Sequence, residues 1–297
     1  MSAAPEYLAL GHVTRDLQPD GTWRLGGTAY FAARTAQRHG LRVAVLTSAP
    51  PDVLLAFREA LPEVEVRAVP SAQATTYENS YAVDGSRRQH VRAVAAPLTA
   101  ADLPDAWRHA DIVHLAPLAD ELGSDLVAAC SGTLTGATPQ GWIRCWDSTG
   151  CVRPGDLMRT RAMLPRLGAL ILSLEDLLPA PGDLPLAGMP ADETAALAVV
   201  REWAQAVPTL VVTRGREGAL VWRDGSVPQA VPGYRVAEVD PTGAGDVFAA
   251  AFLAKLHDLA DALAAAGYAN KVAALSIEHM GADGIPSPDE VVRRFGR

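Results

Sequence analysis

The chemistry of this sequence is concentrated in the hexapeptide PTGAGD, which spans residues 241–246 and leads into an apolar run. Gly243 and Gly245 allow a tight backbone turn, so successive N–H groups can point into one concavity at the start of a helix. The dipole of that helix favours negative charge at the same place. If the bound anion is a phosphoryl group in transfer, the carboxylate of Asp246 is positioned to accept a proton from the attacking hydroxyl. The hexapeptide thus predicts an anion-binding loop with a general base beside it.

The same residues permit other interpretations. Two glycines and an aspartate can form a turn and cap a helix without any further role. A phosphate-binding loop of the Walker type needs GxxxxGK followed by Ser or Thr, and no such lysine follows these glycines. A dinucleotide-binding loop needs a third small residue where Phe248 stands, and it belongs to the first strand–helix–strand unit of a chain. An isolated match favours the simple cap, so the surrounding chain has to decide.

The elements that would position this loop follow a strand–helix–strand order. Strands are predicted at the apolar runs YLALGHV, RVAVLT, VEVRAV, DIVHLA, WIRCWD, ALILS and TLVVT. Helices are predicted at residues 28–39, 52–61, 191–207 and, with a break near 257–259, at 245–279. This alternation predicts a doubly wound α/β fold, with a largely parallel sheet flanked by helices.

Two segments depart from that order and alternate like antiparallel strands. They are residues 14–25 and 75–94, and Asp84-Gly85 supplies a hairpin turn within the second. We expect them to form a small antiparallel β lid that projects from a single domain spanning residues 1–297.

Composition disfavours several classes of protein. With 49% hydrophobic and 20% charged residues, the 297-residue chain is typical of globular proteins. A net charge of -8 provides no overall positive field to attract phosphate backbones at long range, so no nucleic-acid partner is expected. The three cysteines lack metal-binding spacing and predict buried thiols in a reducing compartment, without zinc. We see neither a signal peptide nor the roughly 18 apolar residues of a membrane span, so we expect a cytoplasmic protein without a membrane partner.

Several segments resemble one known family. VDPTGAGDVFAAAFL resembles the carboxy-terminal signature of the PfkB, or ribokinase-like, family of carbohydrate kinases, and LGGTAYFAARTAQRHG is similar to its amino-terminal glycine-pair signature. Further similarity in LGHVTRD, VVTRGREGALVW and YANKVAALSIEHMGADGIP extends the resemblance from residue 10 to residue 286. Because two separate signatures occur in the family's order, the kinase interpretation outweighs the simple helix cap.

The resemblance implies roles for individual residues. Asp246 would be the general base, and the anion hole for the transferring γ-phosphoryl group would comprise Gly243, Ala244 and Gly245. The acceptor-binding positions are matched by Asp16, Gly26 and Gly27, with Tyr77, Asn79 and Arg88 facing the acceptor from the lid. The nucleotide side would comprise Thr213, Arg214, Gly215, Ala269, Asn270 and Gly281.

Two positions differ from the family's pattern. Phe31 stands where the first signature usually has an asparagine, so an apolar ring replaces an amide and implies a different acceptor or a different pose. Ser173 and Asp176 stand for an Asn-x-x-Glu that helps organise the water shell of magnesium, and Asp176 is the metal-side residue we expect. Mg²⁺ is expected from phosphoryl transfer itself, and Asp240 resembles a family position near a monovalent-cation site.

These observations predict an ATP-dependent kinase that acts on a hydroxyl of a small polyol, such as a sugar or a cyclitol like inositol. A nucleoside kinase is a second interpretation, since Phe31 could stack on a base. A non-catalytic nucleotide- or sugar-binding protein of the same fold is a third. A homodimer that associates through the lid is also expected.

Overall fold

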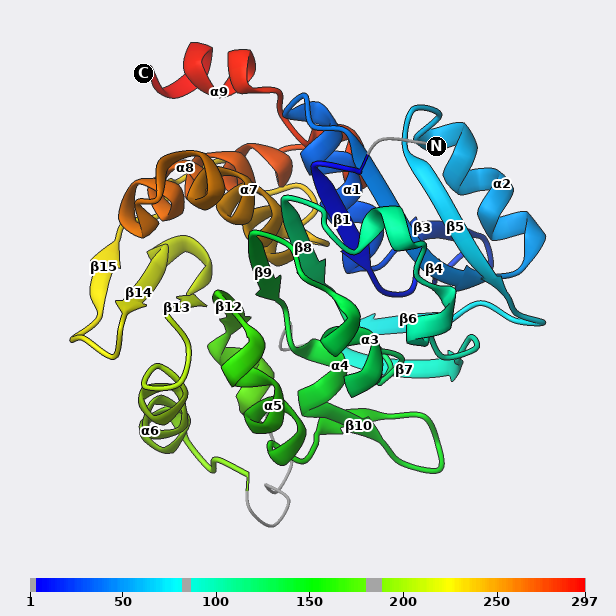
Figure 1. The fold of residues 1–297 in the computed structure, drawn as a ribbon, viewed down its shortest axis with the longest axis horizontal. Coiled ribbons are helices and arrows are strands. Elements are labelled where there is room, and N and C mark those ends of the chain that lie inside the picture. The colour runs from blue at the N-terminus through cyan, green and yellow to red at the C-terminus, as the bar shows by residue number, and fades with distance from the viewer. Residues whose placement is uncertain (1–3, 82–86, 180–188, 297) are drawn as a thin grey trace.

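A computed structural model describes residues 4–81, 87–179 and 189–296. Within these residues the central sheet has nine strands, in the order β15-β14-β13-β12-β9-β8-β1-β4-β5 (Figure 1). The strands are β1 (Tyr7–Leu10), β4 (Val43–Ala49), β5 (Glu65–Pro70), β8 (Ile112–Leu115), β9 (Leu134–Ala137), β12 (Ala169–Ser173), β13 (Thr209–Thr213), β14 (Ala219–Arg223) and β15 (Gln229–Val231). From β13 to β5 all neighbours pair parallel, and only β14 and β15 run antiparallel to their neighbours. The predicted largely parallel sheet is confirmed.

Helices cover both faces of this sheet, because its strands present apolar side chains to both. Along β1, Tyr7 and Ala9 join one hydrophobic cluster, whereas Leu8 and Leu10 join a second cluster on the opposite face. The first cluster includes residues of α1 (Thr28–Arg38), α2 (Pro51–Ala60), α7 (Ala244–Leu259), α8 (Ala262–Ser276) and α9 (Pro288–Phe295). The second includes residues of α3 (Ser124–Ala129), α4 (Gln140–Ile143), α5 (Met158–Met163) and α6 (Glu193–Trp203). Short 3₁₀ turns lie at Ala100–Asp102, Asp105–Trp107, Leu164–Arg166, Leu174–Leu177, Gly215–Glu217 and Gly281–Gly284.

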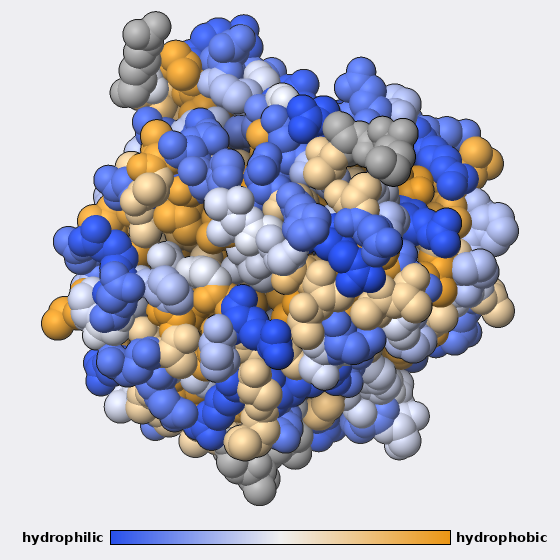
Figure 2. Space-filling model, in the orientation of Figure 1, coloured by the Kyte–Doolittle hydropathy of each residue, from blue (hydrophilic) through white to orange (hydrophobic). Residues whose placement is uncertain are grey.

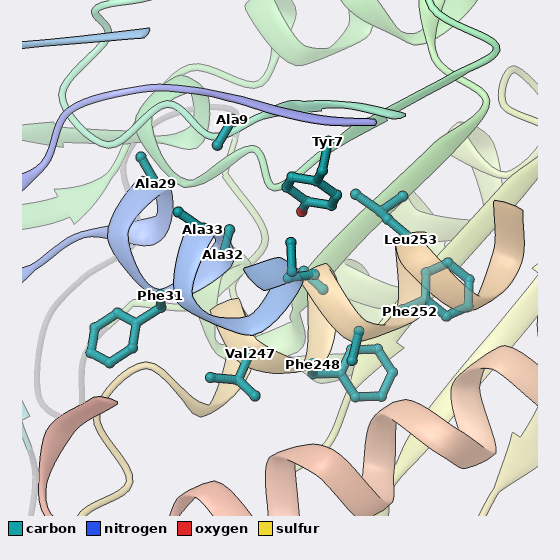
Figure 3. Packing of buried hydrophobic residues seen from close by; sticks show 14 of the residues in the cluster. Tyr7, Ala9, Ala29, Phe31, Ala32, Ala33, Val247, Phe248, Phe252 and Leu253 are labelled. Carbon is teal, nitrogen blue, oxygen red and sulfur yellow. The ribbon is translucent and has the colours of Figure 1, made fainter. Parts of the chain in front are cut away.

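Helix α7 carries the PTGAGD segment at its amino end and is buried along most of its length. Every residue from Val247 to Ala254 is buried, which suits a helix that is apolar on all sides. Its first turns pack beside α1, and side chains of both helices belong to one hydrophobic cluster (Figure 3). The predicted break near residues 257–259 is confirmed, because α7 ends at Leu259 and Ala260 adopts a left-handed conformation with φ 51°.

The predicted lid is a second sheet, with strand order β3-β2-β6-β7. Its strands are β2 (Thr14–Leu17), β3 (Trp23–Gly26), β6 (Thr76–Tyr81) and β7 (Arg87–Ala93). The β2–β3 and β6–β7 hairpins are antiparallel, and β2 joins β6 in parallel. The predicted turn at Asp84-Gly85 lies outside the described residues.

A small hairpin, formed by β10 (Arg144–Trp146) and β11 (Val152–Pro154), lies beside the lid. The backbone N–H of Val91 in β7 donates to the carbonyl of Gly150 at 2.8 Å. His90 forms an isolated antiparallel bridge with Cys151 next to it. The hairpin is therefore attached to the edge strand of the lid.

One predicted strand was wrong as a member of the central sheet. Residues 142–147 form the end of α4 and strand β10, while β9 occupies the sheet position between β8 and β12. Strand β9 has the sequence LTGA, which lacks the long apolar run of its neighbours. A side chain at Gly136 would overlap Leu253 of α7, so the glycine makes room for the helix.

Three surface properties bear on the earlier expectations. Hydrophilic residues cover most of the face drawn in Figure 2, with hydrophobic residues in smaller patches between them. None of the helices described is both long enough and apolar enough to cross a lipid bilayer. All three cysteines are unpaired. Cys151 is buried, as expected, whereas Cys130 and Cys145 are half-buried.

Candidate active site

A cleft of about 1230 Å³ lies between the lid, the carboxyl ends of β12 and β13, and the first turn of α7. Ligands of open α/β sheets commonly bind at this edge, outside the carboxyl ends of the parallel strands. The predicted residues that line the cleft are Asp16, Gly27, Phe31, Tyr77, Asn79, Arg88, Ser173, Asp176, Thr213, Gly215, Gly243, Ala244, Gly245, Asp246 and Asn270. The predicted residues outside its lining are Gly26, Arg214, Asp240, Ala269 and Gly281.

The first turn of α7 presents backbone donors to this cleft. Gly243 precedes the helix in a left-handed conformation with φ 77°, which favours glycine. The N–H of Ala244 donates to the carbonyl of Pro241 at 3.2 Å. The N–H groups of Gly245 and Asp246 have no hydrogen-bond partner among the described residues. Two unpaired N–H groups at the positive end of a helix dipole can bind an anion.

The carboxyl group of Asp246 lies at the same helix start and is half-buried. The hydroxyl of Thr28 donates to its Oδ1 at 2.7 Å. Burial raises the pKa of Asp246 to about 6, with smaller upward contributions from Asp176 and Asp16, while Thr28 and Arg144 oppose the rise. A carboxylate with a pKa close to neutral can act as a general base at physiological pH.

Asp16 enters the cleft from lid strand β2. The hydroxyl of Thr14 donates to its Oδ1 at 2.8 Å. A side chain at Gly26 would overlap the Asp16 carboxylate, so this glycine leaves the carboxylate in its present position although it does not line the cleft itself. Gly27 has φ 88° and starts α1, where a Cβ would lie 2.6 Å from the carbonyl oxygen of His12. The glycine pair thus fixes the approach of the lid strand to α1.

Phe31 forms part of the cleft wall and is only 3% exposed. Its ring lies against Gly243, where a Cβ would approach Phe31 Cδ1 to 2.6 Å. The aromatic ring therefore supports the turn before α7 from within the core. This placement leaves little of the ring for stacking on a ligand.

Arg144 is a cleft residue that the sequence analysis did not identify. Its Nη2 donates to Asp176 Oδ1 at 2.5 Å, and its Nη1 donates to Gln89 Oε1 of the lid at 3.3 Å. The Asp176 and Asp246 carboxylates outweigh the effect of burial and hold the pKa of Arg144 above its usual value. Gln89 in turn donates to Asn79 Oδ1 at 3.1 Å, so a polar chain connects the lid to Asp176.

Asp176 does not present a free carboxylate to a metal in this arrangement. Its Oδ1 is paired with Arg144, and its Oδ2 accepts from the N–H of Ser173 at 3.1 Å. In the part of the chain that is described, no group of three or more His, Cys, Asp or Glu side chains could hold a metal ion. These residues alone therefore do not fit a protein-held magnesium site, and a Mg²⁺ ion would have to enter with the phosphates of the donor.

The predicted nucleotide-side residues divide into two groups. Thr213 and Gly215 line the cleft beyond β13, and Asn270 lines it from α8 while its Nδ2 donates to the carbonyl of Pro232 at 3.0 Å. Arg214, in contrast, is paired with Glu217, and Ala269 is fully buried in the core.

The loop around Asp240 is held by its own carboxylate. The N–H of Gly281 donates to Asp240 Oδ2 at 2.9 Å, and the N–H of Thr242 donates to Oδ1 at 3.0 Å. Burial acts to raise the pKa of Asp240, but these hydrogen bonds outweigh it and leave the pKa below its usual value. Asp240 and Gly281 thus connect two loops rather than line the cleft.

Three functional candidates that were missed carry a weak signal in the sequence. Thr28 directly follows the glycine pair, and its hydroxyl reaches Asp246 only because α1 packs beside α7. Gln140 and Arg144 are spaced i, i+4 in QGWIR, which places them on one side of a helical turn. Neither pattern points to a cleft until the fold is known.

Parts of the chain are similar to known kinases. Residues 174–290 match the sequence model described as pfkB family carbohydrate kinase. The chain is 41% identical to a ribokinase of Bacillus subtilis (strain 168) over 83 residues, which is 28% of each protein. It is 28% identical to an inositol 3-kinase of Zea mays over 251 residues, covering 78% of this chain and 60% of the relative. The chain thus spans less than two thirds of the length of these two relatives.

Two further proteins are similar over a larger part of their length. A cytidine kinase of Thermococcus kodakarensis is 26% identical over 259 residues, covering 84% of this chain and 87% of the relative. The structure of a pyrophosphate-dependent kinase in the ribokinase family, complexed with a pyrophosphate analog and myo-inositol, superimposes with a TM-score of 0.76. It is 22% identical and covers 97% of this chain and 100% of its own, so this likeness shows the fold.

Proposed function

We propose that the chain is a kinase of the pfkB family, whose sequence model matches residues 174–290, and that it transfers the γ-phosphoryl group of ATP to a hydroxyl of a small polyol. The acceptor we propose is a sugar or a cyclitol such as inositol. One observation carries the proposal: the carboxyl group of Asp246, whose pKa is about 6, lies at the start of α7, where the N–H groups of Gly245 and Asp246 have no partner among the described residues. A base and an anion site are what phosphoryl transfer to an alcohol requires.

In the proposed mechanism the acceptor lies between Asp16 of the lid and Asp246. The carboxylate of Asp246 takes the proton of the acceptor hydroxyl as its oxygen bonds to the γ-phosphorus. The bond from that phosphorus to the bridging oxygen breaks, and ADP leaves with the electron pair. The N–H groups of Gly245 and Asp246 stabilise the charge on the transferring phosphoryl group. The lid excludes water, which would otherwise compete with the acceptor.

The donor is proposed to lie on the side lined by Thr213, Gly215 and Asn270. Mg²⁺ bound to its phosphates would neutralise charge on their oxygens, and we route no step through a metal ligand of this chain. The structural neighbour with bound myo-inositol is a pyrophosphate-dependent kinase, so pyrophosphate is the comparison donor for any assay.

A polyol acceptor has more support than a nucleoside. The inositol 3-kinase and the cytidine kinase both match more than three quarters of this chain, so the relatives alone do not decide. Stacking on Phe31 was the feature that favoured a nucleoside, and this ring is 3% exposed and packed against Gly243. A nucleoside kinase is therefore the second candidate, and a binding protein without turnover is the third.

The proposal is tested by acceptor-dependent release of ADP from ATP with magnesium across sugars, inositols and nucleosides, with pyrophosphate as a parallel donor. The expected result is turnover with a sugar or an inositol. A parallel thermal-shift panel separates the alternatives, because a ligand that binds only the native state raises its stability. Stabilisation by ATP without turnover on any acceptor would identify the binding protein instead.

A cytoplasmic location and a homodimer that associates through the lid stay predictions. Size-exclusion chromatography with light scattering would test the second, and a monomer at assay concentrations would contradict it.

A further inference from the structure

One wall of the cleft is built by α4 and the start of β10. Gln140 begins the helix, Arg144 follows it, and both side chains line the cleft. Between them, Gly141 lies against the backbone of the loop after β8, where a Cβ would be 2.6 Å from the nitrogen of Leu118. This glycine lets the helical turn approach closely enough for its two polar side chains to reach the cleft.

These two side chains retain unused hydrogen-bonding capacity. A guanidinium has five N–H donors, and among the described residues Arg144 donates to Asp176 and Gln89. The amide of Gln140 makes no hydrogen bond to any described residue. Because both Nη atoms of Arg144 are held by hydrogen bonds, its remaining N–H donors are fixed in direction. This favours binding of a ligand oxygen.

The lid sets the separation between this wall and Asp16. Asp16 lies on β2 and Gln89, the partner of Arg144, lies on β7, with β6 between them. Asp16 pairs with Tyr77 of β6, whereas Gln89 pairs with Asn79, two residues further along β6. Two strand spacings and two residues along a strand put the Asp16 and Gln89 backbones about 12 Å apart, so the acceptor site has a carboxylate toward one end and the partner of Arg144 toward the other. A molecule that satisfies both ends must carry oxygen atoms on opposite sides.

We propose that Arg144 and Gln140 bind the acceptor and select a six-membered ring polyol, a cyclitol or a pyranose, which carries hydroxyl groups around its whole edge. This inference rests on the proposed function and deepens it. Asp16 accepts hydrogen bonds from hydroxyls at one end, while Arg144 and Gln140 donate to oxygens at the other. Asp176 is a positioning residue, because it fixes the Arg144 guanidinium. A nucleoside presents a flat base at one end and satisfies this wall poorly.

The position of Arg144 also affects the base. Its positive charge opposes the rise in the pKa of Asp246, so removal of that charge leaves the pKa higher. The low-pH limit of turnover should then move to higher pH in an Arg144 variant. Loss of packing alone would not produce that shift.

The experiment compares Arg144→Met and Gln140→Leu with Arg153→Met as the matched control. Arg153 also lines the cleft, but it is exposed and paired with Asp147 at 2.9 Å. With saturating donor, the expected KM for the polyol rises about 10- to 100-fold in Arg144→Met and about 3- to 10-fold in Gln140→Leu. The KM for the donor should stay within about twofold in both, and Arg153→Met should match the wild type.

A deoxy-polyol series identifies the contact on the ligand. One deoxy analogue should bind the wild type more weakly than the full polyol does. Gln140→Leu should bind that analogue and the full polyol equally well. The pH profile of Arg144→Met should shift upward, whereas that of Gln140→Leu should not.

The outcomes separate the two proposals. If the wild type turns over no acceptor, the proposed function fails. If the wild type phosphorylates a polyol but both variants keep its KM, only this inference fails. If a nucleoside is the best acceptor, the ring-polyol assignment is overturned. Should Arg144→Met not fold, Gln140→Leu decides, because the Gln140 amide has no partner among the described residues to lose.

Discussion

Asp246 is the residue on which turnover should depend most. Asp246→Asn keeps a hydrogen-bond acceptor for Thr28 but removes the base, so kcat/KM should fall by about 10²- to 10⁴-fold. Donor affinity, measured by calorimetric titration of the same variant, should change little. Unchanged turnover in the variant would rule out general-base catalysis by this residue.

The pH dependence of turnover should reflect the same group. Burial raises the pKa of Asp246 to about 6, and the base works only when it is unprotonated. The value of kcat/KM should therefore fall about tenfold per pH unit below pH 6 and level off above it. A profile from pH 4.5 to 8.5 checks this, and a midpoint near the ordinary aspartate value would contradict it.

The raised pKa also predicts an effect on stability. The folded carboxyl keeps its proton up to about pH 6, whereas the unfolded one ionises near 3.8. Stability from this group is therefore lost as pH rises between those two values. Since asparagine does not titrate, Asp246→Asn should be more stable than the wild type at pH 8 and lose that advantage at pH 4. Thermal unfolding at both pH values measures it.

At the scale of the element, the first turn of α7 has two glycines with different requirements. Gly243→Ala places a Cβ against Phe31 in a left-handed conformation and should destabilise the protein by about 1–3 kcal/mol. Gly245→Ala is the control, because a Cβ there meets nothing within 4 Å and alanine favours the helix. Chemical denaturation of both variants checks the contrast, and equal stability would show that the turn can relax.

The elements also show how far sequence patterns predict this fold. The long apolar strands and the break between α7 and α8 were predictable, since each has a clear period and recognisable ends. Strand β9 was not, because Gly136 weakens its pattern in order to accommodate Leu253 of another element. The loop at residues 243–246 was identified from its glycines, whereas Thr28 and Arg144 reach the cleft only through tertiary packing.

At the scale of the whole molecule, the sheet connects two hydrophobic clusters into one structure. Trp203 belongs to one cluster and Phe252 to the other, and both are fully buried. Trp203→Ala and Phe252→Ala should each cost about 3–5 kcal/mol, since either substitution leaves a large cavity. Because β1 contributes to both clusters, each variant should still unfold in a single transition by fluorescence and circular dichroism. Two separated transitions in either variant would show that the faces unfold independently.

The gap at Gly136 has a consequence for the distant cleft. Leu253 occupies that gap and follows Asp246 by seven residues on α7, which corresponds to a rise of about 10 Å. The contact between Leu253 and Gly136 thereby fixes the position of α7 along its own axis. This contact in the interior sets how far the amino end of α7, with Asp246, extends toward the ligand. The contact itself meets neither solvent nor substrate.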